Sequence, residues 1–322
     1  MNVIRLLCAC AALFAAGAAS AQPRDFPQRP IRIVVPVPPG GSVDATARLL
    51  APKLSESLGQ SVVIDNRGGA STNIGMELVA RAPADGYTLL ANTAPLVANP
   101  ALFPKLPFSP EKDFAPLSLV VTGPSVVVVH PSVPVRTLAE LITLAKAKPG
   151  SINYSSSGAG TLTHLGAELF KYLSGTNIVH VPYKGGGPAL AAVVAGEIDL
   201  TFQTPLAAAG QIKAGRLRAL AVTAQKRLAI LPEVPTAGES GMPKYEFQSW
   251  VGLLAPATTP QPVLRLLHEN IVKAARSADI AERFAREGAE VVAGTPEQFR
   301  KVMADETALW TRVIREMGIK AE

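Results

Sequence analysis

The feature that most constrains the fold of this 322-residue chain is a regular alternation of short apolar runs with amphipathic segments. Ile31–Val35 is a β-branched run, typical of a buried parallel strand. Apolar residues then recur at helical spacing from Val43 to Leu58, and Gly59 has the position of a helix-ending glycine. The next predicted elements are a strand, a short helix and a strand at Ser61–Asp65, Asn73–Arg81 and Gly86–Ala91. This order, βαβαβ, predicts half of an open, doubly wound α/β sheet.

The alternation starts again near residue 125 and continues to the end of the chain. Strands are predicted at Ser125–Val129, Ile152–Tyr154, Ile178–Pro182, Ile198–Phe202, Leu217–Thr223, Phe247–Leu254 and Ala289–Val292. Helices are predicted at Thr137–Lys146, Thr161–Leu173, Pro188–Ala195, Pro205–Ala214, Pro260–Arg276, Asp279–Glu287 and Thr295–Met317. Two such series agree with the two domains that this length favours.

The N-terminus has the three parts of a secretory signal. A basic stretch, Met1–Arg5, precedes the apolar run Leu6–Ala19, and small residues at 19–21 lead into a polar sequence. The apolar run is too short to span a bilayer with ease, so we expect cleavage after Ala21 and an exported, soluble protein of the bacterial periplasm. The alternative is a lipid anchor on Cys10.

Cleavage would also change the charge and the chemistry of the chain. It removes Cys8 and Cys10, the only cysteines, together with Arg5, so the net charge falls from +6 to +5. The mature protein then has no disulfide and no thiolate ligand, and its four histidines show no metal-ligand spacing. We therefore expect neither a metal nor a cofactor. Residues 123–247 hold 11 Lys/Arg and 7 Asp/Glu, and no basic–aromatic interleaving points to a nucleic-acid partner.

Motifs of enzymes are missing from the sequence. It contains no phosphate-binding G-x-x-x-x-G-K-[ST], no H-E-x-x-H and no G-x-S-x-G, and Thr163 breaks the dinucleotide fingerprint that Gly158–Gly160 would begin. We expect a protein that is not an enzyme. The alternative is an exported hydrolase with a nucleophile among Ser155–Ser157 and His164 as its base.

Loops rich in Gly, Ser and Thr recur where predicted strands lead into helices. In an open α/β sheet such loops line the crevice at the carboxyl ends of the strands, and helix N-termini offer N–H groups and partial positive charge to a carboxylate. The candidate residues of the first half are Gly40, Gly41, Ser42, Asp44, Ala70, Ser71, Thr72, Asn73, Asn92 and Thr93. Those of the second half are Ser155, Ser156, Gly158, Ala159, Gly160, Thr161, His164 and Gly185.

These loops also have a simpler interpretation. Tight turns need glycine, and Ser42, Asn73 and Thr161 have the residue types of ordinary helix N-caps. Asp44 could compensate the helix dipole, or hold a water or a ligand ammonium. Three similar loops at equivalent strand ends favour binding.

The loop sequences resemble those of a known family. PVPPGGSVDATAR (36–48), NRGGASTNIG (66–75), KPGSINYSSSGAGTLTHLGAELF (148–170) and VHVPYKGGGPAL (179–190) look like motifs of the Bug family. These are the periplasmic solute receptors of tripartite tricarboxylate transporters. The resemblance covers nearly the whole mature chain, in order.

The resemblance implies a two-domain periplasmic binding protein fold that closes like a Venus flytrap on a ligand in the cleft. Residues 22–122 and 248–322 would form a discontinuous first domain and residues 123–247 the second. It further implies a monomer that delivers a small organic carboxylate to the membrane subunits of a transporter. A receptor for a membrane signalling protein is the alternative.

Two positions depart from the family pattern. Ser71 and Thr72 stand where many members have glycines, so ligand contacts can differ there. Gln203 stands at a ligand-binding position where many members carry an Asp that could meet a ligand ammonium. Gln203 argues against an amino acid and favours a mono- or dicarboxylate, aromatic acids included.

Overall fold

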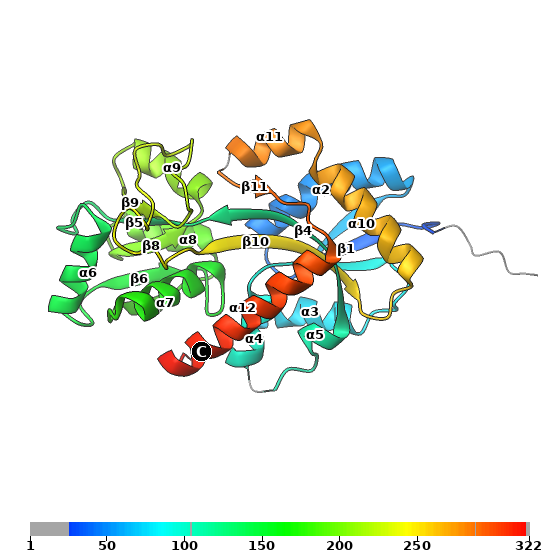
Figure 1. The fold of residues 1–322 in the computed structure, drawn as a ribbon, viewed down its shortest axis with the longest axis horizontal. Helices are drawn as coiled ribbons and strands as arrows, with labels where there is room; N and C mark the ends of the chain where they lie inside the picture. Colours follow the sequence, from blue (N-terminus) through cyan, green and yellow to red (C-terminus); the bar gives the residue numbers. More distant parts are fainter. Residues whose placement is uncertain (1–25, 104, 287, 320–322) are drawn as a thin grey trace, which may run out of the picture.

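Two β-sheets flanked by helices make up the chain in the computed structural model, which describes residues 26–103, 105–286 and 288–319 (Figure 1). The six-stranded sheet has the order β11 (Glu290–Val291), β4 (Phe114–Pro124), β10 (Gln248–Pro256), β3 (Thr88–Asn92), β1 (Ile31–Val35), β2 (Val62–Asn66). The five-stranded sheet has the order β7 (Val179–Pro182), β6 (Asn153–Ser156), β8 (Leu200–Gln203), β5 (Val126–Val129), β9 (Arg218–Val222). The predicted signal sequence and its cleavage site lie outside the described residues.

The six-stranded sheet and its helices form what we call the first lobe. Strands β2, β1 and β3 are parallel, as the βαβαβ pattern predicts. Ile33 of β1 faces the layer of α2 and α10, whereas Val34 faces the layer of α3, α4 and α12. The helices of this lobe are α2 (Ser42–Leu58), α3 (Asn73–Ala80), α4 (Pro95–Leu102), α5 (Pro110–Asp113), α10 (Gln261–Ala275), α11 (Ala278–Arg286) and α12 (Pro296–Met317), with the short 3₁₀ turn η1 (Ala70–Thr72) before α3.

The second lobe contains the five-stranded sheet with α6 (Leu138–Ala147), α7 (Leu162–Ser174), α8 (Gly186–Val194) and α9 (Pro205–Lys213). Strands β7, β6 and β8 are parallel, and β5 pairs antiparallel with both β8 and β9. Aromatic side chains fill the space under α7, where Phe170 packs against Phe202 and Tyr245. All three side chains are fully buried.

Two long strands connect the lobes. β4 and β10 pair antiparallel from Phe114 and Pro256 at one end to Pro124 and Gln248 at the other, and they run side by side through the middle of the molecule (Figure 1). The chain therefore leaves the first lobe through β4 and returns through β10. Helix α12 crosses these strands and contacts both α4 and α7.

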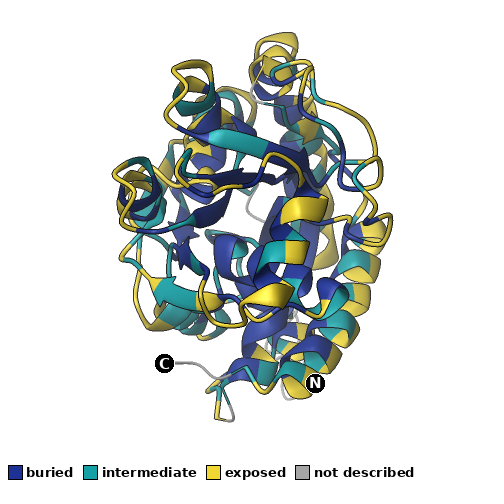
Figure 2. Ribbon diagram, turned by 90° about the vertical axis from the view of Figure 1, so that its left-hand side faces the viewer, coloured by how far each residue is buried: buried dark blue, intermediate teal, exposed yellow. Residues whose placement is uncertain are grey.

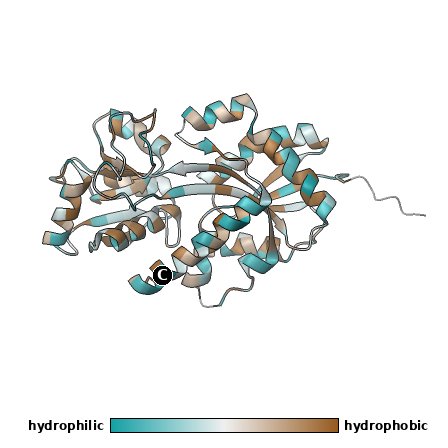
Figure 3. Cartoon of the chain, viewed as in Figure 1, coloured by the Kyte–Doolittle hydropathy of each residue, from teal (hydrophilic) through white to brown (hydrophobic). Residues whose placement is uncertain are grey.

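Burial follows the layers. The strands and inner helix faces are buried while the outer helix faces are exposed (Figure 2), and hydrophilic residues lie on those outer faces (Figure 3). One apolar cluster continues from Leu96 in the first lobe to Leu165 in the second. In the described part of the chain, no helix has both the length and the apolar character needed to cross a membrane.

The predicted elements are all found, with ends that differ by at most two residues. The sequence analysis did not predict α4, α5 or β4. Prolines occur inside or at the ends of these segments, at Pro95, Pro100 and Pro116 for example, and they obscure the periodic patterns on which the predictions rest.

The close packing of α12 on β10 gives a testable prediction. A Cβ atom at Gly252 would overlap the ring of Phe299, which is fully buried. We expect Gly252→Ala to lower the free energy of unfolding by about 1–3 kcal/mol, because a filled core resists extra atoms. Urea unfolding measures this change. Gly210→Ala in α9 is the matched control, since no atom lies within 4 Å of its Cβ position, and it should leave stability unchanged or raise it. Equal stabilities of the two variants would contradict this packing.

Candidate functional site

The loop between β1 and α2 is fixed by Asp44. Its carboxylate accepts hydrogen bonds from the Gly40 N–H at 2.9 Å, from Asn66 Nδ2 at 2.9 Å and from Arg48 Nε at 3.0 Å. Burial raises the pKa of Asp44, but the hydrogen bonds from Arg48, Gly40 and Asn66 outweigh it and hold the pKa below its usual value. Asp44 is 2% exposed. Its carboxylate therefore serves to hold the Gly40 loop against α2 and β2.

The predicted N-cap role of Ser42 is wrong. The N-cap of α2 is Gly41, and Ser42 is the first helical residue, with an exposed side chain. A glycine cannot cap with a side chain, so no side chain occupies the first N–H groups of α2. The start of α2 thus has the uncapped N–H groups that suit an anion, and no serine cap.

The loop between β2 and α3 contains an unusual turn. Ala70, Ser71 and Thr72 all have left-handed backbone conformations, with φ of 46°, 51° and 76°. We call these three residues the left-handed turn. The conformation costs about 1–2 kcal/mol for each residue that has a Cβ atom. Thr72 is the N-cap of α3 without a side-chain cap hydrogen bond, so the predicted cap at Asn73 is also wrong.

Three buried polar atoms near these strand ends have no hydrogen-bond partner among the described residues. They are Thr72 Oγ1, Asn92 Nδ2 and Asn99 Oδ1. Asn92 ends β3, and its other amide atom, Oδ1, accepts the Thr93 N–H at 2.9 Å. An unpaired buried polar group costs about 1–3 kcal/mol, so such atoms point to a place where a ligand or an ordered water binds.

The second-lobe loop between β6 and α7 is held by its own hydroxyl groups. Ser155 is fully buried and donates to Ala189 O at 2.8 Å, which ties β6 to α8. Thr161 Oγ1 donates to Gly158 O at 2.6 Å, and its side chain makes no cap hydrogen bond to α7. Thr161 is thus the N-cap of α7 by position, as the capping interpretation has it, but its hydroxyl does not cap the helix. Ala159 lies half-buried at the middle of this loop.

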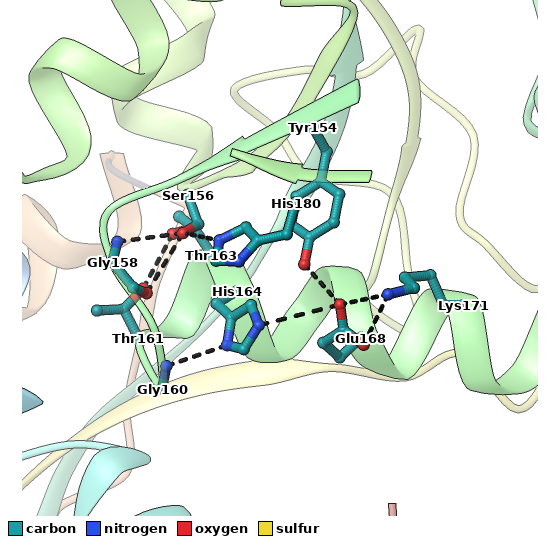
Figure 4. Close-up of polar contacts among 10 residues, drawn as sticks. All are labelled: Tyr154, Ser156, Gly158, Gly160, Thr161, Thr163, His164, Glu168, Lys171 and His180. Atoms are coloured by element: carbon teal, nitrogen blue, oxygen red, sulfur yellow. Dashed lines mark hydrogen bonds and ion pairs between the residues drawn. The ribbon is translucent and has the colours of Figure 1, made fainter. Parts of the chain in front are cut away.

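His164 supports this loop from inside the second lobe (Figure 4). Its Nδ1 accepts the Gly160 N–H at 3.0 Å, which leaves the ring proton on Nε2, and Nε2 lies 3.9 Å from Glu168 Oε1. The ring stacks on His180 with centroids 4.3 Å apart. Burial, followed by the charge of Lys171, lowers the pKa of His164 to about 4, so the ring is neutral. His164 is 3% exposed and acts on the loop through Gly160.

The side chains around His164 carry no net charge together. Glu168 Oε1 accepts from Tyr154 Oη at 2.6 Å and from Lys171 Nζ at 2.7 Å, and all four side chains lie together in Figure 4. Burial, followed by the neighbouring His164, lowers the pKa of His180 to about 4. The cluster thus holds two neutral rings and one ion pair.

The hydrolase alternative required His164 to contact a serine. The serine contact belongs to His180 instead, whose Nε2 lies 2.5 Å from Ser156 Oγ. Ser156 is fully buried, and the Nδ1 of His164 is occupied by Gly160. Ser156 is thus paired with His180 and not with His164, which differs from what this alternative required.

The remaining predicted residues follow β7 and β8. Gly185 is the N-cap of α8 and has φ of 115°, which favours glycine. Gln203 ends β8, is 4% exposed and donates from Nε2 to Thr201 Oγ1 at 3.2 Å. Among the described residues, no group of three or more His, Cys, Asp or Glu could hold a metal.

The two lobes meet at Gly160. A Cβ atom there would lie 3.1 Å from Asn99 Oδ1 and 3.1 Å from Leu102 Cδ1, so the second-lobe loop packs directly on α4. Surface hollows of about 480 and 400 Å³ lie elsewhere, one between α4 and α12 and one beside β9, and neither is lined by a predicted site residue.

The sequence analysis did not identify Asn66 and Asn99 as residues that contact the candidate loops. Asn66 begins the NRGGAST segment and could have been noticed there. Asn99 lies in the unpredicted helix α4, and nothing in its local sequence indicates that its amide contacts the left-handed turn.

The neutral state of His164 predicts a pH-dependent stability. Its pKa is about 4 when folded and 6.5 for the free side chain, so between these values the unfolded chain binds a proton that the folded protein does not. Stability is therefore full above pH 6.5 and falls as the pH drops, by about 3 kcal/mol down to pH 4 for this residue. Urea unfolding at pH 7 and pH 4 should show a loss about 3 kcal/mol larger in the unchanged protein than in His164→Gln. Equal losses would contradict this assignment.

Known proteins share both the sequence and the fold. The family model described as tripartite tricarboxylate transporter family receptor matches residues 46–319. Protein BugT of Bordetella pertussis is 40% identical over 325 residues, which cover 99% of each chain. The structure of Rpa4515 of R. palustris with adipate has a TM-score of 0.84 and 37% identity, and covers 92% of this chain and 100% of its own.

A second ligand-bound structure is similar. MatC of Rhodopseudomonas palustris with bound malate has a TM-score of 0.82 and 31% identity, and the likeness covers 90% of this chain and 100% of that one. The BugT match covers 99% of this chain, and the family model and both structures match residues of both lobes. The chain belongs to the tripartite tricarboxylate transporter receptor family, whose members are solute-binding proteins with a periplasmic binding protein fold.

Proposed function

We propose that this protein is a periplasmic receptor that captures a small organic carboxylate between its lobes and delivers it to the membrane subunits of a tripartite transporter. The observation that carries the proposal is a pair of buried, unpaired hydrogen-bond donors in the first lobe. Thr72 Oγ1 lies at the start of α3, which has no side-chain cap hydrogen bond, and Asn92 Nδ2 lies at the end of β3. Donors without an acceptor suit an anionic oxygen.

The first lobe would hold one carboxylate group. The N–H groups at the starts of α2 and α3 supply further donors and partial positive charge. Asp44 keeps the Gly40 loop in place, and its own negative charge is matched by Arg48 at 3.0 Å. The candidate residues Gly41, Ser42, Ala70, Ser71 and Asn73 line these two loops.

The second lobe would close over the ligand with the loop Gly158–Thr161. The segment 123–247 carries a net +4, which attracts an anion to this side of the cleft. Closure would pivot where β4 and β10 pass between the lobes, near residues 123 and 247, with 22–122 and 248–322 as one body. We expect a monomer, exported after cleavage near Ala21.

The ligand would be a mono- or dicarboxylate, aromatic acids included. Gln203 carries no charge for a ligand ammonium to meet, which disfavours amino acids. Adipate and malate, bound by the two similar structures, are the first acids to test.

Ligand binding should raise the melting temperature of the protein. At a ligand concentration of 100 times Kd the stabilisation is about 2.7 kcal/mol, which raises Tm by roughly 5 °C. We expect such a rise with at least one acid of a panel of adipate, malate, benzoate and glutamate, followed by calorimetry for Kd. Adipamide, the uncharged analogue of adipate, is the matched control and should give no rise. A flat response to every acid, with no ligand copurifying, would contradict the proposal.

Removing one donor should weaken binding without removing the site. Thr72→Val keeps the side-chain shape and loses the hydroxyl, so we expect Kd for the bound acid to rise about 5- to 30-fold. Thr176→Val, which removes another buried hydroxyl just after the C-terminal end of α7, is the matched control and should leave Kd unchanged. Calorimetry at one pH compares both with the unchanged protein. An unchanged Kd in Thr72→Val would remove Thr72 from the site.

A further inference from the structure

Asn99 of α4 contacts the left-handed turn through its side-chain amide. Nδ2 donates to Ser71 O at 2.7 Å and to Asn73 Oδ1 at 2.8 Å. The residue is fully buried, so no water competes for these hydrogen bonds. One amide group thus holds the chain on both sides of Thr72.

The left-handed turn needs such support. Its three residues carry Cβ atoms, and each would be more stable in a right-handed or extended conformation. Gly69, the residue before the turn, has no Cβ atom and adopts its φ of 123° without steric cost. Without a hold on Ser71 O, the segment would relax, and the Thr72 hydroxyl and the first N–H groups of α3 would move with it.

The same side chain faces the second lobe. Its Oδ1 has no hydrogen-bond partner and lies against Gly160, whose own N–H is bound by His164. Asn99 therefore lies between the two loops that would enclose a ligand. A side chain that only filled the core would not need an amide at this place.

We propose that Asn99 is a positioning residue for ligand binding, which holds the left-handed turn in the conformation that binds a carboxylate. This inference rests on the proposed function for its ligand, but the two hydrogen bonds from Asn99 to the turn exist in the protein without a ligand. The proposal predicts that removing the Asn99 amide lets the left-handed turn relax. It also predicts that a residue which adopts a left-handed conformation at lower cost, placed in the turn, compensates for the missing amide.

Hydrogen–deuterium exchange of the ligand-free, full-length protein tests the hold. In Asn99→Ala we expect the amides of residues 71–75 to exchange at least about tenfold faster, since two hydrogen bonds that fix the turn are gone. Adding Ala70→Gly should restore much of the protection, because glycine reaches left-handed φ without strain and Ala70 is exposed. The control Asn270→Ala removes an Asn amide bond to Leu266 O in α10 and should leave residues 71–75 unchanged.

Ligand affinity supplies the second measurement. With adipate or malate as the probe, Kd should rise about 5- to 30-fold in Asn99→Ala and recover in part in Asn99→Ala/Ala70→Gly. If Asn99→Ala fails to fold, Asn99→Asp keeps the shape, lacks the donors and should show the same fast exchange. Unchanged exchange at 71–75, or no recovery with Ala70→Gly, would overturn the inference and leave Asn99 a core residue. If the unchanged protein binds neither acid, the proposed function fails for these acids, while the exchange result still decides the role of Asn99.

Discussion

The antiparallel pairing of β4 with β10 is the interaction on which the rest of the structure depends. The two strands hold the middle of the six-stranded sheet together and carry the chain out of the first lobe and back. Because the return strand is separated from β4 by the whole second lobe, this pairing forms only when that lobe has folded or its ends have been brought together. The same two strands also support α12, which contacts both lobes.

Both lobes fix the glycine loop before a helix start by the same kind of hydrogen bond. In the first, the third residue of α2, Asp44, accepts the N–H of Gly40 four residues earlier. In the second, the third residue of α7, His164, accepts the N–H of Gly160, again four residues earlier. Each contact fixes a glycine loop while the N–H groups of the helix start remain without a side-chain cap. The second lobe does so with a neutral ring, which adds no negative charge opposite an incoming anion.

The sequence predicted most of the fold because strand and helix periods are local signals. It failed at α4 and β4, where prolines break the pattern and tertiary packing decides the structure. The candidate loops were also found from sequence, since glycine and hydroxyl residues gather at strand ends. What could not be predicted is which polar atoms these residues use within the protein. Ser155, for example, faces Ala189 inside the second lobe, and the hold on Ser71 comes from a helix 28 residues away.

The free-energy cost of the loops at the candidate site constrains how such a receptor could work. Three residues in a left-handed turn and three unpaired buried polar atoms oppose folding by several kcal/mol, at about 1–3 kcal/mol for each unpaired group alone. The large apolar core that continues through both lobes offsets this cost. A carboxylate that accepts from Thr72 and Asn92 would recover part of it, so on the proposed function the binding energy comes from pairing donors that the fold has already buried. Such donors recognise a carboxylate group without regard to the skeleton behind it. On the proposed function, discrimination between acids would then come from the second lobe, where Gln203 and the loop at Gly158–Thr161 would meet the rest of the ligand.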